Sequence, residues 1–171
     1  QDRRVEQDIY LPPRLSVSML VALREDPVAL AHAIRRPMPF LQDKYARRGT
    51  DFHNWIEKHL KADTLFDEAD MDYADPIESD EKLETLMTKW LSSHWADKDP
   101  YRIEVPFETT VAGVLLRGRI DAVYKDGDQY TVVDWKTGRA KSGDDLEVAA
   151  IQLAMYRLAY SKLYKVPIEK I

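Results

Sequence analysis

The chain has 171 residues, which is long enough for one domain with a hydrophobic core, and its 30 acidic and 25 basic residues give a formal net charge of −5. The negative charge argues against nonspecific capture of nucleic acid by the whole surface, although it leaves a local basic site open. The absence of cysteine excludes disulfides, thiolate zinc sites and iron–sulfur clusters, and is compatible with a reducing cytoplasm.

The N-terminal part is predicted to be an irregular lead-in over residues 1–15, followed by two short helices. Ser16 or Ser18 can cap the first helix. Asp26-Pro27 starts the second, with an N-cap side chain followed by proline at the first helical position. No apolar run in the chain approaches the ~18 residues of a membrane span, and no signal peptide is visible.

A third helix is predicted over residues 42–61. Gly49 is its weak point, because glycine costs ~1 kcal/mol relative to alanine inside a helix, and it indicates a kink or a close backbone approach. His53 lies beside the apolar stripe, where a histidine is more often a partly buried structural residue than a ligand. The stripe, which predicts one buried face, consists of Phe52, Trp55, Ile56 and Leu60.

The middle of the chain alternates between loop, helix and strand patterns. Residues 61–79 are acidic and are typical of a long loop or lid. An amphipathic helix is expected from Ser79 to about Trp95, and a half-buried strand over residues 101–111. Glu104 is out of phase with the buried positions of that strand, so it is either solvated or an auxiliary ligand.

The stretch from Gly118 to Gly138 organises the rest of the chain. Its β-branched and aromatic residues predict strands over 119–126 and 129–135, joined by a two-residue turn at Gly127-Asp128. That turn places Asp121 directly opposite Asp134, and Arg119 opposite Lys136. The other face carries the apolar side chains expected of a core-facing surface: Ile120, Ala122, Tyr124, Thr131, Val133 and Trp135.

Two opposed carboxylates imply a cation between them. Cross-strand neighbours have Cβ atoms about 4.5–5.5 Å apart, so Asp121 and Asp134 would repel each other. One interpretation is a solvated ladder of ion pairs with Arg119 and Lys136. The alternative is a divalent metal, since carboxylate and carbonyl oxygens are the ligands that Mg²⁺ or Mn²⁺ prefers.

The last segment is predicted to be a loop over 139–145 and a helix over 147–165. Gln152 and Tyr156 are four residues apart, so their side chains point the same way. Other common sites are excluded. The glycine pair Gly113 and Gly118 lacks the following Lys-Ser/Thr of a nucleotide-binding loop, and neither a G-x-S-x-G elbow nor a cysteine nucleophile is present.

Four motifs in the same order resemble those of RecB-type nucleases, in the PD-(D/E)xK superfamily. They are Gly49-x-x-x-His53, Gly118-Arg119-Ile120-Asp121, Asp134-x-Lys136-Thr137-Gly138 and Gln152-x-x-x-Tyr156. Two further stretches, Leu15-Ser16-Val17-Ser18 and Ala46-Arg47-Arg48-Gly49-Thr50, are similar to the C-terminal nuclease domains of actinobacterial UvrD-like helicase–nucleases of the AdnAB type.

This resemblance implies an α/β fold with a central mixed, largely antiparallel sheet flanked by helices, as in restriction endonucleases. It also implies metal-dependent hydrolysis of DNA phosphodiester bonds, often exonucleolytic and on single strands fed by a helicase motor in the same or a partner chain. The expected setting is DNA end processing in a bacterial cytoplasm. We expect a single domain over residues 1–171 that is a fragment of a larger helicase–nuclease chain.

The resemblance also assigns the site residues. Asp121, Asp134 and the backbone carbonyl of Trp135 would hold Mg²⁺ or Mn²⁺, with His53 as a further ligand. Lys136 would lie beside the attacking water, where it stabilises developing negative charge or orients the nucleophile.

Further residues are expected to support DNA binding. Gln152 and Tyr156 match the Q-x-x-x-Y element and would contact phosphates or buttress the site. The basic side chains of Arg48, Arg119 and Arg139 are assigned to the same task. The cysteine ligands of some relatives are missing, so no iron–sulfur cluster is expected.

The resulting hypothesis is a metal-dependent deoxyribonuclease domain. One alternative is a nuclease fold that binds DNA or docks to a motor without cutting. The family fold has a further strand after the Gln152 helix, and its absence from this sequence would be one reason for such inactivity. Another alternative is a metal-free module whose charged face is an ion-pair ladder.

Overall fold

The computed structural model describes residues 10–37, 44–62, 81–138 and 143–171. Contacts along the chain divide it into two compact units, and each is described by itself. The first comprises Gln1–Phe40, Pro106–Gly118 and Lys141–Val166, and the second comprises Leu41–Val105, Arg119–Ala140 and Pro167–Ile171. The acidic stretch predicted as a loop or lid, Ser79 and Arg139 lie outside the described residues.

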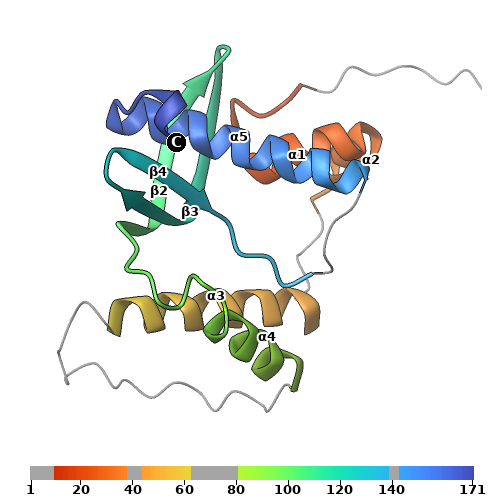
Figure 1. The fold of residues 1–171 in the computed structure, drawn as a ribbon. Coiled ribbons are helices and arrows are strands. Elements are labelled where there is room, and N and C mark those ends of the chain that lie inside the picture. Colours follow the sequence, from red (N-terminus) through yellow and green to blue (C-terminus); the bar gives the residue numbers. More distant parts are fainter. Residues whose placement is uncertain (1–9, 38–43, 63–80, 139–142) are drawn as a thin grey trace, which may run out of the picture. The chain divides into compact units, whose positions relative to one another are not determined.

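Four strands form one mixed sheet in the part of the chain that the structure describes (Figure 1). The longest strand, β3, pairs with β1 in parallel and with β4 in the antiparallel sense, and β2 is its other neighbour. The predicted fold class, an α/β protein with a mixed sheet, is therefore confirmed. The strands are β1 (Arg14–Ser16), β2 (Arg102–Val111), β3 (Val114–Asp126) and β4 (Gln129–Val133).

Two tight turns fix the strand register. Ala112 and Gly113 join β2 to β3 with φ angles of 48° and 81°, the left-handed pair of a type I′ hairpin turn, so these strands are antiparallel. Gly127 has φ 58° and joins β3 to β4. The partners in that hairpin run from Asp126 with Gln129 to Ala122 with Val133. The predicted register is thus confirmed, although β3 begins five residues earlier than expected and β4 ends before Asp134.

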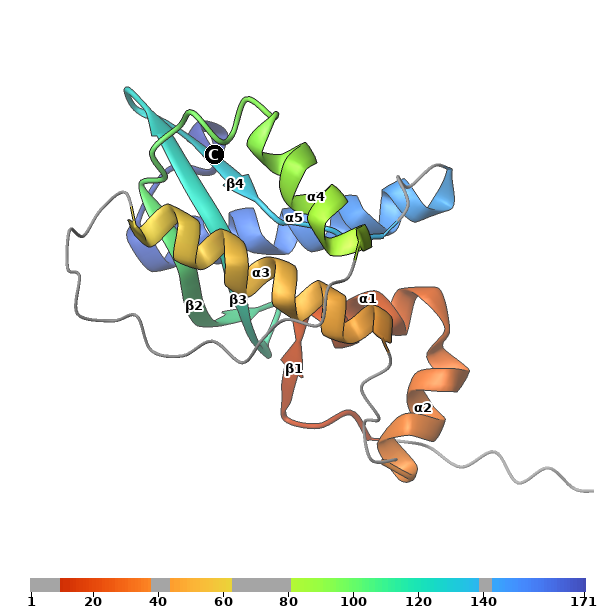
Figure 2. The ribbon, with the colours of Figure 1, turned by 90° about the horizontal axis from the view of Figure 1, so that it is seen from below.

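The first unit contains helices α1 (Val17–Glu25), α2 (Pro27–Arg35) and α5 (Asp144–Tyr164). The predicted caps are present: Ser16 Oγ accepts a hydrogen bond from Met19 N at 3.1 Å, and Asp26 Oδ1 accepts one from Ala29 N at 2.8 Å. Helix α1 packs against both α2 and α5 (Figures 1 and 2). The irregular lead-in was wrong at its last residues, because Leu15 lies in β1 and is only 2% exposed.

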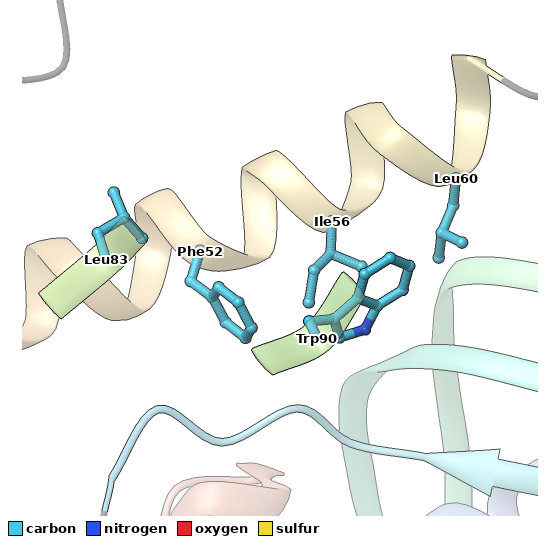
Figure 3. Close-up of a cluster of buried hydrophobic side chains, with 5 residues drawn as sticks. All are labelled: Phe52, Ile56, Leu60, Leu83 and Trp90. Atoms are coloured by element: carbon cyan, nitrogen blue, oxygen red, sulfur yellow. The ribbon is translucent and has the colours of Figure 1, made fainter. Parts of the chain in front are cut away.

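The second unit is built around helices α3 (Lys44–Ala62) and α4 (Glu81–Leu91), which pack side by side. The apolar stripe of α3 is buried, as predicted, and it packs against α4. Figure 3 shows Phe52, Ile56 and Leu60 of the stripe together with Leu83 and Trp90 of α4. Ile103 of β2 and Trp135 pack against the same cluster. A short 3₁₀ helix, η1 (Ile168–Lys170), completes this unit. The cluster consists of Phe52, Ile56, Leu60, Leu83 and Trp90.

Strand β3 is buried on both faces just after Asp121. Ala122 and Val123 are both fully buried, and Tyr124 is 6% exposed. Side chains alternate along a strand, so Val123 shares its face with Asp121. The face predicted to be charged therefore becomes apolar one step further along β3. This places the Asp121 carboxylate at the border of the core rather than on a solvated surface.

Two glycines in motif positions are expected to respond oppositely to alanine. A Cβ at Gly118 would lie 2.6 Å and 2.9 Å from atoms of the Phe107 ring, which is itself buried, so Gly118→Ala should lower the free energy of unfolding by about 1–3 kcal/mol. A Cβ at Gly49 meets only Thr137 Oγ1 at 3.5 Å, so Gly49→Ala should raise it by up to ~1 kcal/mol. Urea unfolding measures both, and equal stability of the two variants would contradict the packing described here.

Candidate metal centre

Three side chains from different elements of the second unit converge on one point. His53 comes from α3, Glu104 from β2 and Asp121 from β3. Each offers one nitrogen or carboxylate oxygen, and these three atoms lie within 4.8 Å of one another. Histidine and carboxylates in such a group are able to bind a divalent cation. Two of the three, His53 and Asp121, were predicted from the sequence.

Asp121 is held by the backbone of Trp135. Trp135 N donates a hydrogen bond to Asp121 Oδ2 at 2.7 Å, and the Asp121 side chain is only 11% exposed. This contact continues the β3–β4 hairpin beyond its last backbone pair, because Asp121 precedes the paired Ala122. The carboxylate orientation is therefore set by the backbone of the same residue whose carbonyl the family resemblance assigned as a ligand.

His53 faces both Trp135 and Asp121. His53 Nε2 lies 3.0 Å from Trp135 O, and His53 Nδ1 lies 3.6 Å from Asp121 Oδ2. A neutral ring that donates from Nε2 to the carbonyl presents its Nδ1 lone pair to the carboxylate. Two electron-rich atoms then face each other, which is favourable only with a proton or another cation between them. Two ligands of a cation at about 2.1 Å each can be up to about 4.2 Å apart, so 3.6 Å suits a shared cation.

Burial shifts the ionisation of Asp121. Loss of water around the carboxyl raises the pKa of Asp121 to about 6, and the nearby charges of Asp134 and Glu104 add to this. His53 and the Trp135 amide lower the pKa without offsetting the burial. Proton and metal therefore compete for Asp121 in mildly acidic solution.

The predicted ligand Asp134 is directed toward Lys136. Lys136 Nζ lies 2.7 Å from Asp134 Oδ2; the Asp134 side chain is 9% exposed, whereas that of Lys136 is 52% exposed. Asp134 is not a member of the three-residue group found in the described part of the chain, although its charge acts on Asp121. Of the two basic residues expected beside the carboxylates, Lys136 is thus paired with Asp134.

The partner of Arg119 is Glu104 rather than Asp121. Arg119 Nη1 donates to Glu104 Oε2 at 2.8 Å, and this contact raises the pKa of Arg119 above its ordinary value. Of the two alternatives for Glu104, the structure supports the approach to the charged cluster, since its side chain is 18% exposed and belongs to the three-residue group. Its out-of-phase position in the strand pattern was the signal for this placement.

The ring of Trp135 anchors the peptide that holds the site. It meets Trp90 and Trp95 edge-on, each at a centroid distance of 6.0 Å. Such edge-to-face pairs contribute about 0.5–1.5 kcal/mol beyond the area that they bury. Because the ring is fixed in this cluster, the Trp135 amide and carbonyl are held in place beside Asp121 and His53.

A cavity of about 420 Å³ opens beside the three-residue group. Helix α3 supplies six of its lining residues, and strands β2 and β3 supply the other three, including the Glu104–Arg119 pair. A polar cavity of this size is large enough for part of a substrate molecule. Its lining consists of Ala46, Gly49, Thr50, His53, Asn54, Glu57, Glu104, Arg119 and Asp121.

The residues predicted to support DNA binding are distributed over both units. On α3, the Arg48 guanidinium lies 5.6 Å from the centre of the Tyr45 ring. In the first unit, Gln152 Nε2 donates to Tyr156 OH at 2.8 Å, so these side chains do point the same way. Tyr156 is only 6% exposed and packs against Phe107. That burial suits a supporting role better than direct contact with a phosphate.

Comparison with known families matches residues 14–170 to the family model of the PD-(D/E)XK nuclease superfamily. The chain belongs to this superfamily. A comparison with curated proteins found no match. Among the described residues, no helix of the superfamily member is both long and apolar enough to cross a membrane.

Members of this superfamily are typically nucleases that use divalent metals, and the donors present here fit such an ion. The group combines one imidazole nitrogen with two carboxylate oxygens. The Trp135 carbonyl contacts His53 Nε2 at 3.0 Å, whereas His53 Nδ1 faces Asp121, so the carbonyl is not a member of this group. Oxygen-rich sets of this kind suit Mg²⁺ and Mn²⁺. The contact of His53 Nδ1 with Asp121 Oδ2 at 3.6 Å suits either a proton or a metal cation between the two atoms.

The raised pKa of Asp121 predicts a pH-dependent stability in the absence of metal. Between about pH 4 and pH 6 the folded protein keeps a proton on Asp121 that the unfolded chain has lost, so the free energy of unfolding should fall as pH rises through this window. Asp121→Asn should flatten this fall and should be at least as stable as the parent at pH 7, because it removes a buried charge beside Asp134. Urea unfolding in EDTA across this range measures the effect. An unchanged slope in the variant would show that Asp121 does not titrate as described.

Proposed function

We propose that the chain is a divalent-metal-dependent deoxyribonuclease domain that hydrolyses DNA phosphodiester bonds. One observation carries the proposal: His53 and Asp121 both contact the backbone of Trp135, and Lys136 is the next residue along the chain. This arrangement occurs in a member of a nuclease superfamily. The resemblance to RecB-type motifs supports exonucleolytic action on single-stranded ends delivered by a helicase motor. DNA end processing and recombinational repair in the bacterial cytoplasm are the proposed setting.

In this proposal His53, Asp121, Asp134 and the Trp135 carbonyl hold Mg²⁺ or Mn²⁺. When bound, the ion supplies Lewis-acid chemistry: it lowers the pKa of a water and neutralises charge on the phosphate. Asp121 is already oriented by the Trp135 amide. Asp134 has to turn from Lys136 toward the group, which is a change of side-chain rotamer in a residue just past the end of β4.

Lys136 is the proposed electrostatic catalyst. Its side chain is half exposed, so the ammonium is able to reach a substrate beside the metal ligands. There it orients the attacking water and stabilises the negative charge that develops on the phosphate oxygens. Arg48, Arg119, Arg139, Gln152 and Tyr156 are proposed to bind or support the strand around this centre.

Metal binding should raise the melting temperature. Mg²⁺ or Mn²⁺ binds only the folded arrangement of His53 and Asp121 and relieves the repulsion of the carboxylates, so a thermal scan should shift upward with metal concentration. Asp134→Ala should abolish most of the shift. Asp126→Ala, a change at an exposed carboxylate of the same hairpin, is the matched control and should keep the full shift. A full shift in Asp134→Ala would place the ion on other residues.

Lys136→Ala should separate catalysis from metal binding. Loss of one electrostatic stabiliser of the transition state typically costs ~10²–10³ in rate, whereas metal affinity should be kept or increased because a neighbouring positive charge is removed. The assay follows the product lengths of a short single-stranded DNA with Mn²⁺, and the exposed Lys58→Ala on α3 is the control. Cleavage by Lys136→Ala within a few-fold of the parent would exclude the proposed role. Metal binding by the parent without any product would instead favour the non-cleaving alternative.

A further inference from the structure

Glu104 has an unusual backbone conformation in the interior of strand β2. Its φ angle is 49°, in the left-handed region that residues with a Cβ adopt at a cost of roughly 1–2 kcal/mol. Its neighbours Ile103 and Val105 face the core side of the same strand. A strained backbone persists only when its surroundings hold it, and it often serves to redirect one side chain at a functional site. Here the redirected side chain is the carboxylate of Glu104.

The Glu104 carboxylate has one positive partner, Arg119, and also lies where a cation could bind. Glu104 Oε2 accepts the hydrogen bond of Arg119 Nη1 at 2.8 Å. One Glu104 oxygen also belongs to the group with His53 and Asp121 that suits a cation. A carboxylate carries a single negative charge, so its attraction for one partner weakens when it is shared with the other. Arg119 and a bound cation are therefore competitors for Glu104.

Arg119 is well placed to act once this attraction weakens. Its side chain is 65% exposed and lines the 420 Å³ cavity beside the three-residue group. A guanidinium presents a planar fork of donors that matches the oxygens of a phosphodiester. While Arg119 is held on Glu104, part of this donor set is occupied.

Building on the proposed nuclease function, we propose that Glu104 is a positioning residue that couples metal loading to DNA binding. In the metal-free protein Glu104 holds Arg119. With a divalent cation at His53 and Asp121, Glu104 turns its charge to that cation and releases Arg119 to a phosphate of the DNA strand in the cavity. By thermodynamic reciprocity, a strand phosphate on Arg119 frees Glu104 and raises metal affinity by the same factor.

A double-mutant cycle on metal affinity tests the competition without any cleavage assay. Binding of Mn²⁺ is measured by equilibrium dialysis, with no DNA present, for the parent, Arg119→Met, Glu104→Gln and the double variant. Arg119→Met should raise the affinity by up to about fivefold, the size expected for an exposed ion pair, because the competitor is removed. Glu104→Gln should lower it. In the Glu104→Gln background, Arg119→Met should change nothing, since Glu104 is what the two cations share.

Arg119→Lys is the matched control, because it keeps the positive charge and should stay near the parent affinity. If Arg119→Met leaves the affinity unchanged, or raises it equally with and without Glu104, the coupling does not exist. Arg119 is exposed, so this variant is able to fold whatever happens to Glu104→Gln. Asp121→Asn distinguishes failure of the coupling from failure of the proposed nuclease function. If Asp121→Asn binds Mn²⁺ as the parent does, the metal site lies elsewhere, and both the coupling and the proposed function are overturned.

A second measurement tests whether metal binding increases the affinity for DNA through Arg119. The affinity for a short single-stranded oligonucleotide is compared in Ca²⁺ and in EDTA over a range of salt, and the oligonucleotide length is checked after each titration. In the parent, Ca²⁺ should raise the affinity and make the salt dependence steeper. In Arg119→Met the slope in Ca²⁺ should be less negative by about 0.7, the loss of one phosphate contact on a single strand. Equal slopes in the two proteins would overturn the release of Arg119.

Discussion

The hydrogen bond from Trp135 N to Asp121 Oδ2 is the contact on which the site depends. A carboxylate at the edge of the core needs a donor, because a buried charge without one is costly. Here the donor is an amide at 2.7 Å, from the first residues beyond β4. The carbonyl of the same residue, in the next peptide plane, lies 3.0 Å from His53 Nε2. A single backbone segment thus orients both an acidic and an imidazole ligand, and a shift of that segment would misplace both.

The segment is held by packing rather than by secondary structure. Strand β4 ends at Val133, so the ladder does not fix Trp135. Its ring does, because it is part of the hydrophobic cluster between α3 and α4, which also fixes the helix that carries His53. The geometry of the site in this unit therefore depends on the packing of the core. A substitution in the cluster far from the metal ligands should disturb the ligands through Trp135.

The sequence predicted the hairpin register, because Gly127 with Asp128 permits a single tight turn and leaves one pairing. The motif resemblance also pointed to His53 and Asp121, which the structure brings together, and to Lys136, which lies beside Asp134; their roles in metal binding and catalysis stay predictions. The sequence did not predict the direction of the Asp134 side chain, because Lys136 two residues later competes for that carboxylate. The out-of-phase position of Glu104 gave its approach to the cluster only as one of two alternatives, since strand alternation carries no sign of the positive φ at this residue. Strand β1 is too short for any periodic pattern.

Because of the aromatic packing around Trp135, the intrinsic tryptophan fluorescence of the protein can be used to monitor the site. The chain has four tryptophans, and all of them lie in one chain of ring contacts: Trp55 with Trp90 at 5.7 Å, and Trp90 and Trp95 each with Trp135 at 6.0 Å. Excitation energy is expected to pass between indoles at such separations, and coupled rings give intense near-ultraviolet circular dichroism. The tryptophan emission of the protein therefore comes from one connected cluster that includes Trp135, whose backbone holds Asp121, so a change in that emission reports on the packing around the site.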